Sequence, residues 1–465
     1  MNFDKTTGEI IASKKPVSFD SSSDSITNSN ILMLGWEFPP LKNGGLGVAC
    51  FGLLCGFGQI NYPVDFALPY KMETTKTGEG QKFHFMDQPG EGKFQSNAKE
   101  NAGNQDNNFK TDFYSGKKFL SFNIPGENIL ATSYNNSFVK DMPLMDQVKL
   151  YAQNTIKYLV LNNLAYKLIH AHDWLTAVAA IEINKIFGTP FIFHIHATEW
   201  DRAGEFGNLE IREIELEAVK LAQKIVCVSN YTKNIVLKHY NGIAEKIEII
   251  HNGIDSDLYE LIGKDLLALE SNSKGLENLL DLINLKDIGY KFVLFVGRLT
   301  FQKGVEFLLE AAKMVKKHHN QCIFLITGRG DMETELIDTA AKMGLGDSVI
   351  FCGWQNDNFL SALYTIADVF VMPSRSEPFG LVALEAAIHK TPVIISKTSG
   401  AAEVMPHSLQ VDHWDVGKIS HYILSIITYR PLSNVLSSLA ASHVGGLDWK
   451  TAAGKLAEIY DKSIY

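Results

Sequence analysis

Two cations, Arg298 and Lys303, follow an apolar run that is typical of a β-strand, Lys291–Gly297. Gly304 comes next and precedes a stripe of apolar residues at helical spacing. A guanidinium binds phosphate through two parallel hydrogen bonds and an ammonium adds a point charge, so the pair could share one diphosphate. The alternative is two solvated surface cations, which is the common state of Lys and Arg. Their position favours the diphosphate site, because ligands of parallel α/β sheets bind beyond the carboxyl ends of strands.

Two glutamates lie in a second segment of this kind. Glu377 follows a predicted strand, and Glu385 lies in the helix that is predicted to begin near Gly380. A carboxylate can accept hydrogen bonds from neighbouring hydroxyls, so Glu377 could hold a sugar ring and Glu385 a ribose. The free amides at the start of the helix, those of Phe379, Gly380 and Leu381, would face the same ligand.

A glycine cluster follows the first predicted strand, Ile31–Gly35, and includes Gly44, Gly45 and Gly47. These glycines could bring amides against a phosphate at a helix N-terminus, or they could form a tight turn before a buried helix. Their spacing fits the GxGxxG pattern of dinucleotide-binding domains poorly, which disfavours a nicotinamide cofactor.

Histidines occur in pairs at the ends of two further predicted strands. His170 and His172 precede Asp173, and His194 and His196 end the next strand. We expect the members of each pair to point to opposite faces, so that one faces the ligand and the other is a core histidine. Asp173 is either the N-cap of the following helix or a carboxylate on the ligand side.

The whole chain has 465 residues, enough for two or three domains, and a formal net charge of −9. The negative charge disfavours a nucleic-acid-binding role. Five cysteines scattered through apolar runs indicate reduced thiols and a cytoplasmic protein. We expect no signal peptide and no stable membrane insertion. The triplet Asp255-Ser256-Asp257 follows the turn signal Asn252-Gly253, so we interpret it as a turn and predict no metal or cofactor.

Strand-like runs alternate with helical patterns in both halves of the chain, which predicts two doubly wound α/β domains facing a cleft. We expect a disordered tail over residues 1–29, a first domain over 30–255, a linker over 256–290, and a second domain over 291–445. Residues 70–140 interrupt the first domain and are predicted to be an irregular insertion or a pair of hairpins.

Taken together, these strings resemble the retaining glycosyltransferases of the GT-B fold, in particular glycosyltransferase family four and the bacterial glycogen and starch synthases. The resemblance spans about residues 30–463. Leu447-Asp448-Trp449 looks like the family's closing segment, which implies that the final helix, 446–465, crosses back to the first domain. The strings that carry the resemblance are residues 36–47, 170–174, 228–229, 252–255, 297–304 and 377–385.

The resemblance implies a role for each candidate residue. Arg298 and Lys303 would bind the donor diphosphate, Glu377 the donor sugar, and Glu385 the ribose. The remaining candidates are the amides of Phe379, Gly380 and Leu381 for sugar hydroxyls and phosphate, Lys42, Gly44 and Gly45 closing the site from the first domain, His196 near the anomeric carbon, and Asp173 on the sugar or acceptor side.

The expected reaction is transfer of a hexose, most simply glucose, from a nucleotide-diphosphate sugar to a soluble saccharide or glucan with retention of configuration. Two departures leave the donor base and the acceptor open: Gly47-Val48 stands where many glycogen synthases have Ala-Asp, and Glu385 follows the family-four pattern. The alternatives are a nucleotide-sugar epimerase of the same architecture and a hexosyltransferase with a lipid or other small acceptor. An acidic balance over Leu209–Lys224 and over the whole chain disfavours an anionic membrane.

Overall fold

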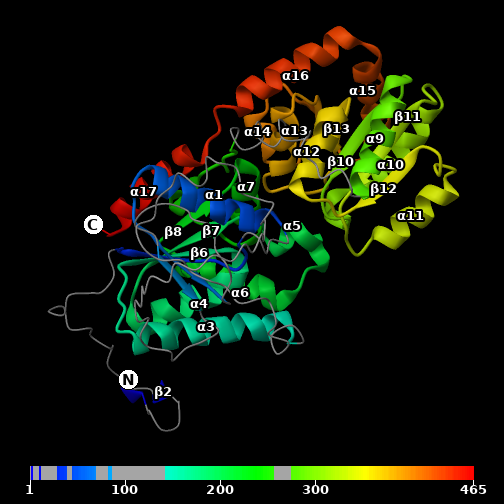
Figure 1. The fold of residues 1–465 in the computed structure, drawn as a ribbon. Coiled ribbons are helices and arrows are strands. Elements are labelled where there is room, and N and C mark those ends of the chain that lie inside the picture. Colours follow the sequence, from blue (N-terminus) through cyan, green and yellow to red (C-terminus); the bar gives the residue numbers. More distant parts are fainter. Residues whose placement is uncertain are drawn as a thin grey trace, which may run out of the picture.

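The computed structural model describes residues 2–3, 10–11, 29–38, 44–69, 82–85, 142–255 and 274–464. These residues form two α/β lobes, the first built mainly from the first half of the chain and the second from the second half (Figure 1). A short antiparallel pair, β1 (Asn2–Phe3) and β2 (Ile10–Ile11), stands apart from both. Lys42, Ser256 and Asp257 lie outside the described residues, so their predicted roles are not addressed below.

The first lobe is built on a seven-stranded sheet in the order β5-β4-β3-β6-β7-β8-β9. Every neighbouring pair is parallel, and the central strands are buried on both faces, which explains why they appear in the sequence as continuous apolar runs. β5 lies in the segment expected to be irregular or hairpins, and it pairs parallel to β4. The strands are β3 (Ile31–Leu34), β4 (Asp65–Leu68), β5 (Lys82–Phe85), β6 (Leu168–His172), β7 (Phe191–Ile195), β8 (Lys224–Cys227) and β9 (Ile247–Ile249).

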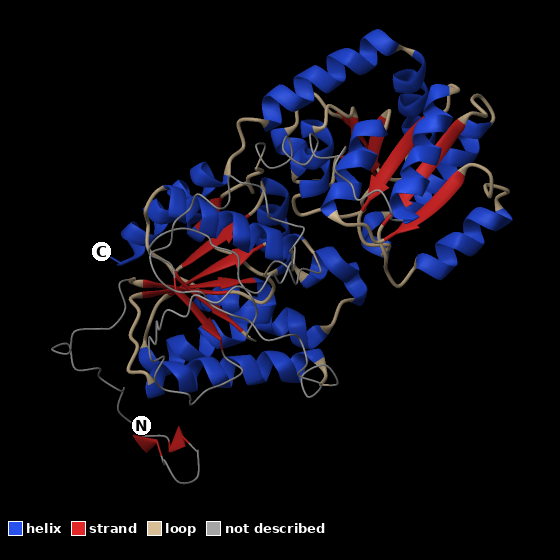
Figure 2. Cartoon of the chain, in the orientation of Figure 1, coloured by secondary structure: helices blue, strands red, loops and turns tan. Residues whose placement is uncertain are grey.

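Helices cover both faces of this sheet (Figures 1 and 2). One face packs against α3 (Leu144–Leu161), α4 (Asp173–Phe187) and α6 (Leu209–Leu221), and the other against α1 (Gly45–Gln59) and α17 (Trp449–Ile464). The buried face of α3 includes Val148, Ala152, Ile156 and Leu159, which recur at helical spacing. The shorter elements are α5 (Glu199–Ala203), η2 (Gly204–Phe206), α7 (Asn230–His239) and η3 (Ala244–Lys246).

The final helix α17 packs beside α1 on the first lobe, although it follows the second lobe in sequence (Figure 1). Gly52 and Gly56 of α1 lie so close to Trp449 that a Cβ on either glycine would overlap it. The amide of Ile254 donates to the carbonyl of Leu447 at 2.8 Å, so the two chain crossings between the lobes run side by side.

The second lobe has a six-stranded parallel sheet in the order β12-β11-β10-β13-β14-β15. One face packs against α9 (Lys274–Asp287), α12 (Asp357–Ile366), α13 (Leu381–Ile388) and α16 (Arg430–Val444), and the other against α10 (Val305–Lys316), α11 (Glu333–Lys342) and α15 (Val416–Thr428). The strands are β10 (Lys291–Val296), β11 (Cys322–Thr327), β12 (Val349–Gly353), β13 (Val369–Met372), β14 (Val393–Ser396) and β15 (Leu409–Val411); η5 (Phe301–Lys303) and α14 (Ala401–Val404) complete the lobe.

The prediction of two doubly wound α/β domains is confirmed. α9 lies in the segment expected to be the linker, and its Leu279 and Leu282 are buried in the core of the second lobe. All five cysteines are free. Among the described residues, no helix combines the length and apolar character needed to cross a membrane.

Candidate active site

The structure brings Lys303 and Glu377 together. The Lys303 Nζ lies 2.5 Å from a Glu377 carboxylate oxygen, and the two side chains are only 15% and 8% exposed. Arg298 is exposed just after β10, and no ion pair to it occurs within the described parts of the chain. Gly304, with φ +64°, lies so close to the carbonyl of Pro373 that a Cβ would overlap it, so this glycine lets the two strand-end loops approach. At this edge of the sheet, Lys303 is therefore paired with a carboxylate, whereas Arg298 is exposed to solvent.

The loop that carries Glu377 is fixed by its own neighbours. The Glu377 amide donates to the carbonyl of Thr398 at 2.9 Å, and its carbonyl accepts from the amide of Gly400 at 2.8 Å. Ser374 Oγ donates to the Glu377 carboxylate at 3.3 Å. The carboxylate is therefore held in place before any ligand arrives.

The N-terminus of α13 opens beside this carboxylate. Gly380 caps the helix with φ +102°, and Leu381 is the first helical residue. Phe379 is buried, and its carbonyl accepts from the amide of Ala401 at 2.6 Å. The first amides of a helix have no intrahelical acceptor and carry the positive end of the dipole, so this end of α13 suits an anionic ligand. Glu385 lies one turn further on, where it accepts a hydrogen bond from the buried Tyr364 hydroxyl at 2.9 Å.

The first domain approaches the same region through the start of α1. Gly44 is the exposed N-cap of α1, with extended backbone. A Cβ on Gly45 would lie 3.9 Å from the Leu381 side chain, which packs against the α1 core. The N-termini of α1 and α13 therefore lie close together across the two domains.

Asp173 does not act as a cap for its own helix. It is the first residue of α4, has φ +52°, and its Oδ1 accepts from the amides of His196 at 2.6 Å and Ala197 at 3.2 Å. Burial raises the pKa of Asp173 to about 6, although Arg202 and the two amides oppose the shift. The carboxylate thus fixes the segment that leaves β7.

The expectation that only one histidine of each pair faces the site is wrong. His170, His172, His194 and His196, here called the histidine cluster, lie on one face of β6 and β7, because residues two apart in a strand share a face. His172 Nδ1 lies 2.8 Å from His196 Nε2, and His170 Nε2 lies 3.2 Å from His194 Nδ1. Burial lowers the pKa of all four rings, to about 3 for His196, so the cluster is neutral at pH 7.

Three members of the cluster, His170, His172 and His194, have ring nitrogens within 4.8 Å of one another, a spacing that could admit a metal. Both nitrogens of His170 are already hydrogen-bonded, one to His194 and the other to the Tyr460 hydroxyl at 2.5 Å. The His170 and His194 rings are also stacked at an interplanar angle of 12°, whereas metal ligands converge on a point. We therefore interpret the cluster as a hydrogen-bonded network that anchors α17 to the sheet.

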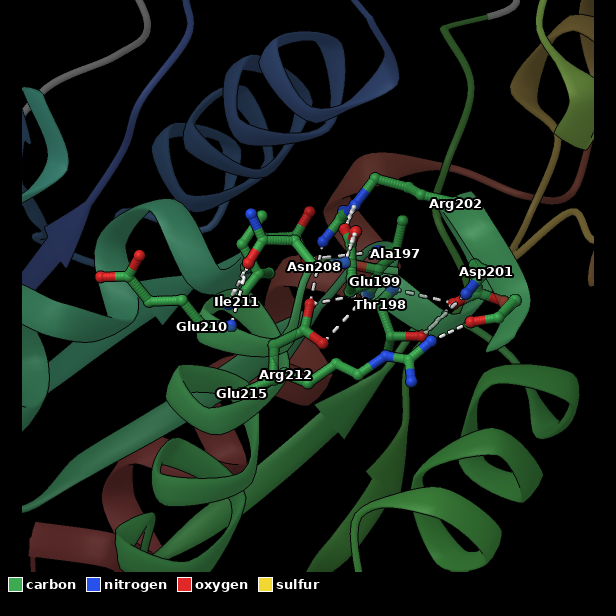
Figure 3. A network of polar contacts seen from close by, with 12 residues as sticks. Ala197, Thr198, Glu199, Asp201, Arg202, Asn208, Glu210, Ile211, Arg212 and Glu215 are labelled. Atoms are coloured by element: carbon green, nitrogen blue, oxygen red, sulfur yellow. Dashed lines mark hydrogen bonds and ion pairs between the residues drawn. The ribbon is translucent and has the colours of Figure 1, made fainter. Parts of the chain in front are cut away.

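A buried charge network holds the segment after His196 (Figure 3). Arg202 donates to the Glu199 carboxylate at 3.0 Å, to the Glu215 carboxylate at 2.9 Å and to the Ala197 carbonyl at 2.9 Å. Glu215 is 2% exposed and also accepts from the Tyr240 hydroxyl at 2.5 Å. Burial raises the pKa of Glu215 to about 7 against the pull of Arg202. The network ties α5 to α6 and so stabilises the region next to Asp173 and His196.

Three residues near the carboxyl ends of strands in the second sheet were not among the candidates predicted from the sequence. Trp354 follows β12 and is 64% exposed, and Arg329 follows β11 and is also exposed. The strand-end rule that selects Arg298 would have selected both, had it been applied to every strand of the second sheet. Ser376 donates to Asp201 of the first domain at 2.7 Å, a contact for which the sequence gives no signal.

Comparison with known proteins agrees with the fold. The family model described as Glycosyltransferase Family 4 matches residues 136–258, and that described as Glycosyl transferases group 1 matches residues 281–440. The chain is 29% identical over 384 residues to an uncharacterized glycosyltransferase of Methanocaldococcus jannaschii, covering 82% of this chain and 83% of that protein. It is 28% identical over 302 residues to a glycogen synthase of Mycobacterium tuberculosis, covering 63% and 68%.

A solved structure shares the whole architecture. Anabaena HepE, in complex with UDP and glucose, superposes with a TM-score of 0.64 at 17% identity, covering 93% of this chain and 99% of that one. An identity this low supports the fold alone. The matched family domains and the two facing doubly wound domains together make this chain a glycosyltransferase of the GT-B fold, similar to glycosyltransferase family four and the glycogen synthases.

Proposed function

We propose that the protein transfers glucose from a nucleotide-diphosphate donor to a soluble α-glucan-type saccharide and retains the α-configuration. The observation that carries the proposal is the close pair of Lys303 and Glu377, beside the open Arg298 and the N-terminus of α13. This arrangement offers two cations and helix amides for a diphosphate, with a fixed carboxylate beside them for sugar hydroxyls.

The donor would bind mainly to the second domain. The diphosphate would lie between Arg298, Lys303 and the first amides of α13, and the ribose would meet Glu385. Trp354 offers an exposed ring at the end of β12 on which a nucleobase could stack. The similarity to a glycogen synthase and to a structure holding UDP and glucose supports a nucleotide-glucose donor and leaves the base open.

In this proposal the leaving group is stabilised by protein cations. As the bond between the anomeric carbon and the diphosphate breaks, negative charge grows on the departing oxygen, and Arg298 and Lys303 would neutralise it. The acceptor hydroxyl would attack on the same face and pass its proton to that oxygen. His196 would lie near the anomeric carbon, where a neutral imidazole can accept or donate a hydrogen bond without adding charge, and Asp173 would lie on the sugar or acceptor side. No metal is required.

The acceptor assignment rests on charge and on the relatives. The chain carries a net charge of −9, so an anionic bilayer would repel it, whereas a neutral glucan would not. The resemblance to a glycogen synthase points the same way.

The direct experiment supplies radiolabelled ADP-, UDP- and GDP-glucose with glycogen, maltooligosaccharides and anionic liposomes in parallel. We expect label in the glucan, released by an α-specific glucosidase. Label in the lipid fraction alone would overturn the acceptor, label released only by a β-specific enzyme would overturn retention, and an altered free monosaccharide would favour an epimerase.

A further inference from the structure

Ser376 lies at a contact between the two domains. It directly precedes Glu377, the fixed carboxylate of the second domain. Its hydroxyl donates to Asp201 Oδ1 at 2.7 Å and accepts from the Tyr231 hydroxyl at 3.0 Å. Both partners belong to the first domain, so the Ser376 hydroxyl makes two hydrogen bonds across the interface, one as donor and one as acceptor.

Asp201 connects this contact to the acceptor side. It is 3% exposed and forms the capping box of α5, in which its Oδ2 accepts from the amide of Thr198 at 2.8 Å and from its hydroxyl at 2.7 Å. Thr198 stands two residues after His196. The buried Asp201 carboxylate therefore links Ser376 to Thr198, and so to the segment that carries His196.

A second contact between the two domains joins α14 to the start of α7. The Glu403 carboxylate of α14 accepts from the amides of Asn230 at 2.9 Å and Tyr231 at 2.8 Å, at the N-terminus of α7. His251 Nε2 donates to it at 3.1 Å. Partial burial acts to raise the pKa of Glu403, but these hydrogen bonds outweigh burial and hold it below the usual value, so the carboxylate is ionised in the interface.

The α14 contact reaches the donor loop as well. The residue before α14, Gly400, donates to the carbonyl of Glu377 at 2.8 Å, and Ser229 Oγ donates to the carbonyl of Pro378 at 2.6 Å. A Cβ on Gly400 would lie 2.7 Å from the Cβ of Ser229, so the two backbones approach closely there. Residues 229–231 thus contact the loop on both sides of Glu377.

We propose that Ser376 and Tyr231 are positioning residues, which set the place of Glu377 and Lys303 in the second domain relative to His196 and Asp173 in the first. Glu403 docks α14, and the loop bonded to it, on α7. Because Arg298, Lys303 and α13 all belong to the second domain, loss of the Ser376 contact should leave nucleotide binding intact and slow the sugar-transfer step. The catalytic readout of this inference rests on the proposed function, whereas the docking readout does not.

The first experiment compares Ser376→Ala and Tyr231→Phe with the matched surface changes Ser425→Ala and Tyr429→Phe, which lie on and just after α15. We expect each test variant to lower kcat about three- to tenfold, the scale of one net hydrogen bond, with donor KM within about twofold. Tyr231→Phe should cost little more in the Ser376→Ala background, since the two residues share one contact. Ser376→Thr should restore most of the rate, because it keeps the hydroxyl.

The second experiment needs no donor or acceptor. Hydrogen exchange followed by mass spectrometry reports on the amides of Asn230 and Tyr231, which should exchange at least about threefold faster in Glu403→Ala than in wild type. The exposed α11 change Glu335→Ala serves as the control.

Unchanged exchange in Glu403→Ala would overturn the docking contact whatever the enzyme transfers. A wild-type kcat in both Ser376→Ala and Tyr231→Phe, or a loss confined to nucleotide affinity, would overturn the positioning role. Should wild-type protein glucosylate no tested acceptor, the proposed function fails, and the donor-hydrolysis rate of the same variants then decides the positioning role.

Discussion

Replacing Lys303 should separate the two tasks that its ammonium performs. It neutralises the nearly buried Glu377, and in the proposed mechanism it also stabilises the departing diphosphate. Removing one preorganised charge partner costs about 2.7–4 kcal/mol of transition-state stabilisation, so Lys303→Ala should lower kcat/KM by about 100- to 1000-fold. Leaving a buried carboxylate without its cation costs a further ~3–5 kcal/mol of folding stability.

Arg298→Ala is the contrasting change, because Arg298 is exposed and makes no ion pair among the described residues. Its loss should change the free energy of unfolding by no more than about 0.5 kcal/mol. In the transition state it should still cost about 2 kcal/mol, a rate loss of about 30-fold. We therefore expect Lys303→Ala to lower both activity and stability, and Arg298→Ala to lower activity with little change in stability.

The assay combines steady-state kinetics with urea unfolding of the wild type, both single variants and Lys303→Ala with Glu377→Gln. Neutralising Glu377 in the Lys303→Ala background should recover most of the lost stability and none of the rate. Rates within threefold of wild type in both single variants would refute the leaving-group role. Recovery of the rate in the double variant would show that the ammonium acts only on Glu377.

Three further outcomes are expected. Turnover should survive excess EDTA, and loss of activity that manganese restores would contradict neutralisation by Arg298 and Lys303. Gly253→Ala should lower the thermal midpoint by several degrees in calorimetry, because its Cβ would lie 2.5 Å from the Trp449 amide nitrogen at the domain crossing, and an unchanged midpoint would contradict the close packing there. Stability in urea should fall between pH 7 and pH 5, since the unfolded chain protonates four imidazoles that stay neutral when folded. The raised pKa values of Asp173, Asp201 and Glu215 act in the opposite sense, but these carboxyl groups are fewer than the imidazoles. A flat profile would contradict the neutral cluster.

Much of the geometry of the candidate site in the second domain could be predicted from the sequence, because its signals are local. Lys303 ends η5 in the connection after β10, and Glu377 lies in the loop after β13; parallel strands end at one edge of their sheet. The sheet order places β13 beside β10, so the two loops meet without any further information. The glycines that permit this approach, Gly304 and Gly380, have positive φ and are visible in the sequence as helix starts.

The first domain's site could not be predicted as well, because its geometry depends on contacts between distant segments. Asp173 has the form of a helix cap, yet its positive φ turns the carboxylate toward β7, a choice that only the packed strand reveals. The prediction for the histidines is wrong for a different reason. Residues two apart in a strand share a face, so each pair lies on one face, and the register of β6 with β7 then brings the two pairs together. The hydrogen bond from Ser376 to Asp201 joins two domains, and no motif or hydrophobic periodicity in the sequence predicts it.

Charge is divided unequally between the two sides of the site, and this division constrains the order of events. In the proposed mechanism the second domain contributes the cations Arg298 and Lys303, the latter paired with Glu377, and these cations would draw a dianionic diphosphate. The first domain contributes a neutral histidine cluster and Asp173, whose pKa of about 6 keeps it mostly ionised at pH 7 and hydrogen-bonded to backbone amides. On this proposal a free saccharide would gain little from the first domain before the donor arrives, whereas an anionic donor would bind the second domain first. We therefore expect the donor to bind before the acceptor, while the contact at Ser376 holds the first domain next to the donor loop.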